Sequence, residues 1–304
     1  MTKPFRKAIR GQAVRGELLP GQSQELLRLL GIVDRRGNVQ ADARRKLKQV
    51  NHLARLLEPA LQDALERHPA PVLVDAAAGN AYLGFVLYDL YLRPAGRGEL
   101  VVVEPRPDLA GRVRERAQGL GWERVRVLEA PLRTAPLPER VHALVALHAC
   151  DTASDEALLR ALAHRADHVA VIPCCQAELA RQLQSLGDAL PDPALRALWR
   201  HPWHRRELGS HLTNVIRALW LEAQGYQVTV TELTGWEHAL KNELILGRRV
   251  GAPLARAQRE LEALLERIPV RPALLAQALN AAPAPPPPTP EPPPGPPAPP
   301  PPPR

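Results

Sequence analysis

Short apolar runs alternate with helix-like segments from Pro71 onward, and this alternation constrains the fold more than any other feature of the 304-residue chain. The runs cover 72–75, 100–104, 125–129, 141–148 and 168–173, and the segments between them lie near 82–92, 107–120, 154–165 and 176–188. Runs of this length that are apolar throughout are typical of strands buried on both faces. Their alternation with helices predicts an α/β fold with a doubly wound parallel sheet.

Two further apolar runs, at 227–233 and 243–248, differ from the others in how they are connected. Only residues 234–242 separate them, and this link is too short for a crossover helix. We therefore expect an antiparallel hairpin at the edge of the sheet, which gives seven strands in all. A doubly wound sheet that ends in such a hairpin is typical of Rossmann-like methyltransferases rather than of ordinary dinucleotide-binding domains.

Breaks in the pattern predict four regions. They are a basic helical N-terminal region (1–70), a cofactor-binding domain (71–250), a C-terminal helical extension (251–280) and a proline-rich tail (281–304). In the first region we expect Ser23 to cap a short helix and Asp42 to cap a long one that reaches about His68, with a kink or break at Pro59. The tail holds 16 of the 34 prolines between 283 and 304 and is expected to be disordered.

The long N-terminal helix has two stripes at spacings of three and four residues. The apolar stripe is expected to pack on the core and consists of Leu47, Val50, Ala54, Leu57, Leu61 and Leu65. The basic stripe consists of Arg45, Lys48, His52 and Arg55. Residues 1–70 contain 14 Lys and Arg against 7 Asp and Glu, so they hold +7 of the net charge of +8. This asymmetry favours a polyanionic partner, and we expect the basic stripe to bind RNA. A solvated helix face is the alternative.

Other features place the chain in the cell. No apolar run reaches the length needed to span a bilayer, and the first residues lack the apolar middle of a signal peptide. Three cysteines, two of them adjacent, fit a reducing compartment. We expect a cytoplasmic protein without a membrane partner, and the sequence leaves its oligomeric state open.

The segment Asp75-Ala-Ala-Ala-Gly79-Asn-Ala-Tyr-Leu-Gly84 joins the first strand to the first helix of the sheet. Small residues there let the backbone approach a ligand, and the following helix start offers free N–H groups. The segment has one glycine where a dinucleotide fingerprint has three, because Ala77 and Ala81 take the outer positions. The residues expected to contact a cofactor are Asp75, Ala77, Gly79, Asn80, Tyr82 and Leu83.

The next two strands also end in acidic residues. Glu104 follows the second strand and is placed to hold two ribose hydroxyls. Glu129 follows the third and can accept a hydrogen bond from an adenine amino group. A series of strands tipped with acids predicts S-adenosylmethionine as the cofactor.

Polar residues follow the later strands at the same sheet edge, where doubly wound folds bind ligands. His148 and Asp151 follow the fourth strand, Cys174 and Cys175 follow the fifth, and His238 and Lys241 lie in the hairpin link. We expect His148 and Asp151 to bind or deprotonate a nitrogen or oxygen acceptor, with His238 or Lys241 orienting it. His148 is also expected to lie beside the cofactor. The alternative is that His148 and Asp151 only cap the next helix.

The chain resembles a family of class I S-adenosylmethionine-dependent methyltransferases related to the methyltransferase domain of the glutathione S-transferase C-terminal-domain-containing proteins. The resemblance is carried by Lys48-Gln-Val-Asn-His52, the segment Asp75 to Gly84, Leu147-His-Ala-Cys-Asp-Thr-Ala-Ser-Asp155, Pro173-Cys-Cys-Gln-Ala-Glu178 and Glu237-His-Ala-Leu-Lys-Asn242. It departs from the family at Ala76-Ala77, where the family has a Gly/Cys-containing turn, and at Ala239-Leu240, where Thr-Pro is usual. The resemblance implies the fold and the cofactor but no established substrate.

Three alternatives remain beside an RNA methyltransferase of this kind. One alternative is that the chain methylates a protein, and another is that it binds cofactor or RNA without turnover. It can also methylate carbon 5 of cytosine in RNA, since this reaction needs a thiolate and Cys150, Cys174 and Cys175 follow suitable strands. We expect no metal, because no Cys-x-x-Cys pair is present. Two other features stay open: His201-Pro-Trp-His-Arg-Arg206 is either a recognition segment or an exposed loop, and Arg217 is read as a surface charge.

Overall fold

The computed structural model describes residues 18–34, 41–147, 149, 151–173, 176–186, 193–233 and 243–280. Seven strands within this part of the chain form one sheet in the order β3-β2-β1-β4-β5-β7-β6. Their bounds are β1 Val72–Ala76, β2 Glu99–Val103, β3 Val125–Leu128, β4 Ala143–Leu147, β5 His168–Ile172, β6 Tyr226–Glu232 and β7 Glu243–Arg249. Strands β1 to β5 pair in parallel, and β7 pairs antiparallel with both β5 and β6.

This topology confirms the predicted fold class, a doubly wound sheet with an antiparallel hairpin edge. Every predicted strand is present and begins and ends within two residues of its predicted bounds. The signal was strong because β1 and β5 are buried along their whole length and so contain apolar residues on both faces. The strand order reverses at β1, which has β2 on one side and β4 on the other. Doubly wound sheets bind ligands at the carboxyl ends of the strands at such a point.

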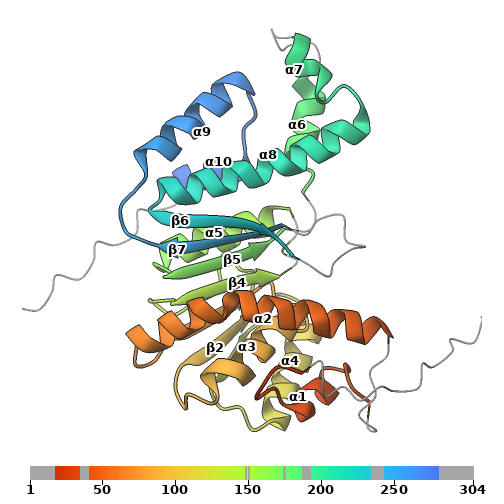
Figure 1. Ribbon diagram of the computed structural model, residues 1–304, viewed down its shortest axis with the longest axis vertical. Helices are drawn as coiled ribbons and strands as arrows, with labels where there is room; N and C mark the ends of the chain where they lie inside the picture. Colours follow the sequence, from red (N-terminus) through yellow and green to blue (C-terminus); the bar gives the residue numbers. More distant parts are fainter. Residues whose placement is uncertain are drawn as a thin grey trace, which may run out of the picture.

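Helices cover both faces of the sheet. Their bounds are α1 Gln24–Leu29, α2 Ala41–Arg67, α3 Tyr82–Leu87, the π-helix η2 Tyr88–Leu92, α4 Pro107–Gly119, α5 Thr152–Ala163, α6 Glu178–Leu186, α7 Pro193–Ala197, α8 Pro202–Ala223, α9 Ala255–Arg267 and α10 Ala273–Asn280. One hydrophobic core joins α1, α2, α3, η2 and α4 to one face, and a second joins α5, α6 and α8 to α10 to the other. Figure 1 shows α2 crossing the lower half of the sheet and α8 running along its upper end.

Helix α2 carries the two stripes that the sequence predicts. All six residues of the apolar stripe are buried, and all except Leu65 belong to the same core as the neighbouring sheet face. The helix is not split at Pro59, which lies inside it and is exposed. Water can bond the carbonyl that Pro59 leaves without a donor, so the continuous helix is tolerated. The boundary at residue 70 stays a prediction, but α2 is packed against the sheet.

Several elements differ from the sequence prediction. Ser23 caps α1 as expected, because its Oγ accepts the N–H of Leu26 at 3.2 Å. Helix α8, however, begins at Pro202, so the run from His201 to Arg206 is the start of a helix and not a loop. Pro202 fits the first helical position, where no N–H is needed. The short helix α7 was not predicted, whereas α10 lies within the predicted C-terminal helical extension.

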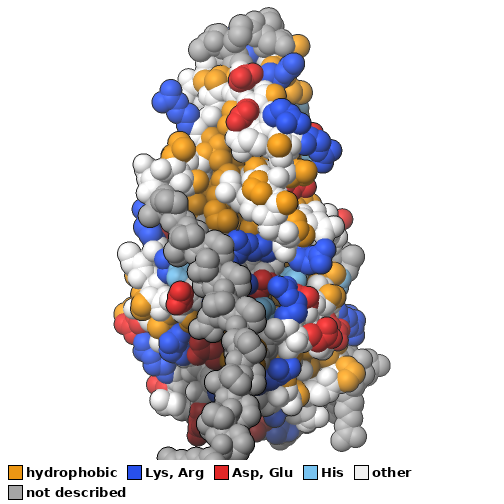
Figure 2. All heavy atoms as spheres, turned by 90° about the vertical axis from the view of Figure 1, so that its left-hand side faces the viewer, with side chains coloured by type: hydrophobic (Ala, Val, Ile, Leu, Met, Phe, Trp, Pro, Cys, Tyr) orange, Lys and Arg blue, Asp and Glu red, His pale blue; other side chains and the backbone are white. Residues whose placement is uncertain are grey.

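The parallel strands β1 to β5 begin at the left of Figure 1, and Figure 2 views the molecule from that side. Basic and acidic side chains are intermingled over the middle and lower parts of this surface, and apolar ones gather in its upper part. Each described helix is too short or too polar to cross a lipid bilayer. The proline-rich tail, residues 1–17 and the hairpin link 234–242 lie outside the described residues.

Candidate active site

The loop between β1 and α3 has an unusual backbone. Ala77, Gly79 and Ala81 have φ values of 53°, 58° and 54°, so three of its five residues adopt the left-handed conformation. Glycine adopts it freely, whereas each alanine pays about 1 kcal/mol or more. The loop is fixed by the N–H of Ala78, which donates to the carbonyl of Val103 at 3.1 Å. Alanine therefore occupies both outer positions of the motif in the left-handed conformation.

Asp75 lies beneath this loop and is 1% exposed. Its Oδ2 accepts the N–H of Gly84 at 3.0 Å. Burial raises the pKa of Asp75 to about 7, and the charge of Glu104 acts in the same direction. A Cβ at Gly84 would lie 2.6 Å from Asp75 Oδ2, so only glycine leaves room for this carboxyl group.

Glu104 connects the end of β2 to the loop. The side chain is 1% exposed, and its Oε2 accepts the N–H of Gly79 at 2.7 Å. Its Oε1 accepts from Arg106, through Nε at 2.6 Å and the backbone N–H at 3.1 Å. Burial raises the pKa of Glu104, but the hydrogen bonds from Arg106 and Gly79 outweigh it and hold the pKa below its usual range. A charged carboxylate thus stands beside the loop at neutral pH.

The other residues predicted to contact the cofactor surround this pair. The amide oxygen and carbonyl of Asn80 accept from Arg116 at 3.2 and 3.3 Å. Tyr82 is half-buried at the start of α3, whereas Leu83 is buried in the core. Glu129 follows β3 and pairs with Arg114 at 2.9 Å. The ends of β1, β2 and β3 therefore bring together acidic side chains and small loop residues, as the sequence predicts.

On the acceptor side, the predicted residue that the structure describes is Asp151. Its φ of 49° and ψ of −119° lie in a region that residues other than glycine rarely adopt, and such strain is common at functional sites. The carboxylate contacts the N–H of Ala177 at 3.4 Å and Arg181 at 3.3 Å. His148, Cys150, Cys174, Cys175, His238 and Lys241 lie outside the described residues, so their roles stay predictions.

Arg217 was read as a surface charge, and this interpretation is wrong. It is 1% exposed and its Nε donates to Asp155 at 2.7 Å, so the two form a buried ion pair. Its Nη2 donates to the carbonyl of Asp151 at 2.9 Å, which holds the strained residue in place. The spacing in α8 was the available signal, because Arg217 lies three and four residues from the buried Trp220 and Thr213.

The guanidinium of Arg217 also reaches the segments around β5 and β7. Its Nη1 donates to the side-chain oxygens of Gln176 at 3.3 Å and Asn214 at 3.2 Å. Gln176 donates to Asn214 at 2.8 Å, and Asn214 donates to Glu243 at 2.7 Å. One buried network thus fixes the segments that follow β4 and β5 and the start of β7. These are the segments that the sequence predicts to face the methyl acceptor.

The basic stripe spans residues 45–55 of α2, a helix that packs in the same core as α3. Lys48 and Arg55 are exposed and His52 is half-buried, while the side chain of Arg45 lies outside the described part of the chain. The ammonium group of Lys46 lies 4.4 Å from the centre of the Tyr82 ring. The start of α2 therefore contacts the first residue of α3, the helix that follows the cofactor loop.

Comparison with known proteins identifies the domain that contains these residues. Residues 45–182 match a protein family described as a methyltransferase domain. The matched stretch, just under half of the chain, contains most of α2, the cofactor loop, Glu104, Glu129 and Asp151. The chain carries an S-adenosylmethionine-dependent methyltransferase domain. No curated protein matches the chain.

Solved structures similar to this methyltransferase share little sequence with it. An S-adenosylhomocysteine-bound methyltransferase from Podospora anserina is 16% identical, with a TM-score of 0.42 over 75% of this chain and 88% of its own. A magnesium protoporphyrin IX methyltransferase from Synechocystis is 14% identical, with a TM-score of 0.42 over 74% and 92%. An rRNA methylase from Streptococcus thermophilus is 12% identical, with a TM-score of 0.41 over 64% and 94%.

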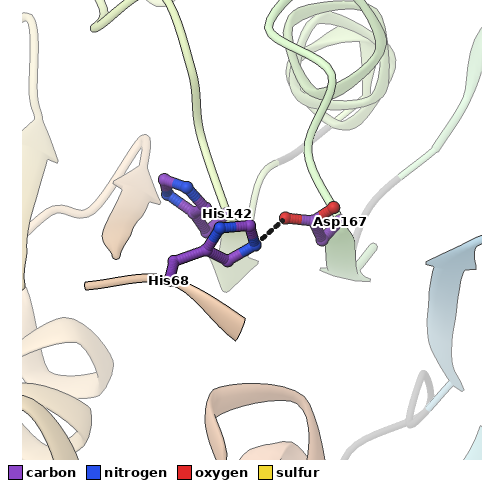
Figure 3. A group of neighbouring side chains, drawn as sticks. All are labelled: His68, His142 and Asp167. Carbon is purple, nitrogen blue, oxygen red and sulfur yellow. Dashed lines mark hydrogen bonds and ion pairs between the residues drawn. The ribbon is translucent and has the colours of Figure 1, made fainter. Parts of the chain in front are cut away.

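The methyltransferase also has a cluster of His68, His142 and Asp167 at the edge where the strands begin (Figure 3). His68 Nε2 lies 3.1 Å from Asp167, and the two imidazole rings are 4.1 Å apart. The ligand-type atoms of the three residues lie within 4.8 Å of one another. However, His142 Nδ1 accepts the N–H of Val72 at 2.8 Å, so the neutral ring carries its proton on Nε2 and has no free lone pair for a metal ion.

The cluster makes stability depend on pH. Burial and the neighbouring His68 lower the pKa of His142 from 6.5 to about 4. The unfolded chain then binds the proton more tightly, so stability is complete above pH 6.5 and is lost as the pH falls toward 4. We expect a loss of up to about 3 kcal/mol from this group. Urea unfolding over this pH range measures it.

His142→Asn is the matched control, because the amide oxygen can accept the N–H of Val72 in place of Nδ1 but does not titrate. The variant should lose clearly less stability than the wild type over the same pH interval. An unchanged pH dependence in the variant would show that other groups cause the acid sensitivity.

Proposed function

We propose that this methyltransferase acts on RNA and transfers the methyl group to a nitrogen or oxygen atom. The position of the basic start of α2 carries this proposal. Lys46 lies over Tyr82 beside the cofactor loop, and Lys48 and Arg55 are exposed along the same helix. A phosphate backbone bound to these residues would pass the carboxyl edge of the sheet, where the methyl group is presented.

The residues at this edge fit the cofactor. Glu104 places two carboxylate oxygens beside the loop, and the exposed side chain of Arg106 donates to both of them. If this side chain moves aside, each oxygen loses one hydrogen bond and can accept a ribose hydroxyl instead. Ala77 and Ala78 have small side chains and Gly79 has none, so the adenosine can approach the backbone. S-adenosylmethionine supplies an electrophilic methyl group on a sulfonium. The protein needs only to align the acceptor and to remove its proton.

Asp151 is the described residue best placed for the second task. Its backbone is held by Arg217, while its carboxylate is partly exposed at the end of β4 and is shared with Arg181. His148 is expected to assist it, with His238 or Lys241 orienting the acceptor. Cys174 and Cys175 matter only if the acceptor is carbon 5 of a pyrimidine. The relation to the glutathione S-transferase C-terminal-domain-containing proteins and the cytoplasmic location also belong to this proposal.

The test uses the purified full chain, tritiated S-adenosylmethionine and total RNA from a strain that lacks the protein. We expect label in RNA. Asp151→Asn should abolish transfer while calorimetric titration still shows binding of S-adenosylhomocysteine, because Asp75 and Glu104 are unchanged. The matched control is Asp108→Asn, which removes an exposed carboxylate of α4 and should leave transfer intact.

Other outcomes would redirect the assignment. Label in polypeptide and none in RNA would identify a protein methyltransferase. Label in cytosine that disappears in Cys174→Ser or Cys175→Ser would identify the thiolate-dependent reaction. Full transfer by Asp151→Asn would remove Asp151 from the mechanism.

A further inference from the structure

The start of helix α8 projects beyond the active-site edge of the sheet. The side chain of Gln176, which follows β5, donates to the carbonyl of Ser210 at 3.1 Å, so Ser210 lies at the level of this edge. Trp203 is seven residues earlier in the helix, which places it about 10 Å farther out at 1.5 Å per residue. Figure 1 shows this end of α8 extending past the strands, next to α7.

This projecting end, here called the α8 tip, consists of Arg200, His201, Trp203, His204 and Arg206. It is fixed to the body of the protein at two points. Trp199 is 3% exposed and belongs to the second hydrophobic core. Gly209 packs so closely on α6 that a Cβ there would lie 2.6 Å from the backbone nitrogen of Ala180. The tip is therefore a rigid extension of the site.

The chemistry of the α8 tip combines an aromatic ring with cations. All five side chains are exposed, and Trp203 leaves 57% of its surface open. The guanidinium of Arg206 lies 4.3 Å from the centre of the Trp203 ring, and the rings of His201 and His204 are 5.5 Å apart. Residues 200–207 contain three arginines and one acid, Glu207, which pairs with Arg206 at 3.1 Å.

We propose that the α8 tip is a stacking platform for single-stranded RNA. Trp203 stacks on a base close to the target nucleotide, and Arg200 and Arg206 contact the neighbouring phosphates. An exposed tryptophan among cations suits a nucleobase, whose flat face and adjacent phosphate match the ring and the guanidinium. The proposal rests on the RNA acceptor proposed above and adds a substrate-binding site on the side of the edge opposite α2.

The test measures binding of a fluorescein-labelled single-stranded RNA of about fifteen nucleotides to the full chain by fluorescence anisotropy. Trp203→Leu keeps an apolar side chain but loses the stacking ring, and we expect it to weaken binding by about fivefold to a hundredfold. Trp203→Phe keeps a ring and should stay close to the wild type. Leu198→Ala, which removes an exposed apolar side chain just before the α8 tip, should have no effect on RNA binding.

The outcomes separate this proposal from the assignment of RNA as acceptor. If the wild type methylates RNA and Trp203→Leu binds as tightly as the wild type, the platform is wrong and the RNA acceptor stands. Equal losses in Trp203→Leu and Trp203→Phe would also overturn the platform, since a stacking ring would then make no difference. If the wild type labels only protein and does not bind the RNA probe, both proposals fail.

Discussion

Gly84→Ala is expected to weaken binding of S-adenosylhomocysteine by about a hundredfold or more. The new Cβ would lie 2.6 Å from Asp75 Oδ2 and 2.9 Å from Asp75 Cβ. Both groups are buried, so the carboxyl group must move and lose the N–H of Gly84. Overpacking together with an unsatisfied buried carboxyl costs about 3 to 5 kcal/mol. Asp75 fixes the start of α3, directly after the cofactor loop, through this hydrogen bond. Calorimetric titration should therefore show the cost as lost affinity for S-adenosylhomocysteine.

Gly79→Ala is the matched control in the same loop. Its Cβ would meet only Arg106 Nη2 at 3.7 Å, and its N–H to Glu104 is kept. Its φ of 58° costs about 1 kcal/mol for alanine, or roughly a fivefold loss of affinity. In the background Asp75→Gly, which removes every side-chain atom that the new Cβ would meet, Gly84→Ala should have little further effect. Wild-type affinity in the single variant Gly84→Ala would show that the loop does not depend on this contact.

Arg217→Met is expected to separate cofactor binding from methyl transfer. The variant leaves Asp155 buried without its partner, which costs about 3 to 5 kcal/mol of stability. It also removes the donors to the Asp151 carbonyl and to Gln176. We therefore expect transfer to the acceptor to fall at least about tenfold. Binding of S-adenosylhomocysteine should be kept, because the cofactor loop and Glu104 follow β1 and β2 and do not contact Arg217.

A purely structural role for Arg217 makes a different prediction. The double variant Asp155→Leu with Arg217→Met replaces the buried ion pair by apolar side chains, and such replacements often restore stability. If Arg217 positions the acceptor side, the double variant should unfold at a urea concentration close to that of the wild type yet still transfer slowly. Recovery of both stability and transfer would limit Arg217 to holding the fold together.

The sequence predicted the sheet well because its strands are buried on both faces. Such strands are continuous apolar runs, and the acids at the ends of β1 and β2 stand out against them. The cofactor half of the site could therefore be located from local pattern alone. Asp75 and Glu104 are both buried at the expected edge, where Glu104 accepts the N–H of Gly79 in the loop and Asp75 accepts the N–H of Gly84 in α3.

The acceptor half depends on contacts between distant segments, which no local pattern contains. Arg217 bonds Asp155 across 62 positions of the chain, and nothing near Arg217 in sequence identifies that partner. The start of α8 was missed for a related reason. His201 to Arg206 shows no apolar periodicity because this turn projects from the body and has no core to face.

The position of α2 limits how this enzyme can be dissected. Leu47, Leu53 and Leu57 of α2 are buried in the core on one face of the sheet. The burial of each contributes about 1.5 to 3 kcal/mol to the stability of the fold. A polypeptide that starts at β1 would expose the apolar sheet face that α2 covers, and it would be prone to aggregate. A transplant of the catalytic unit into another protein must therefore include α2.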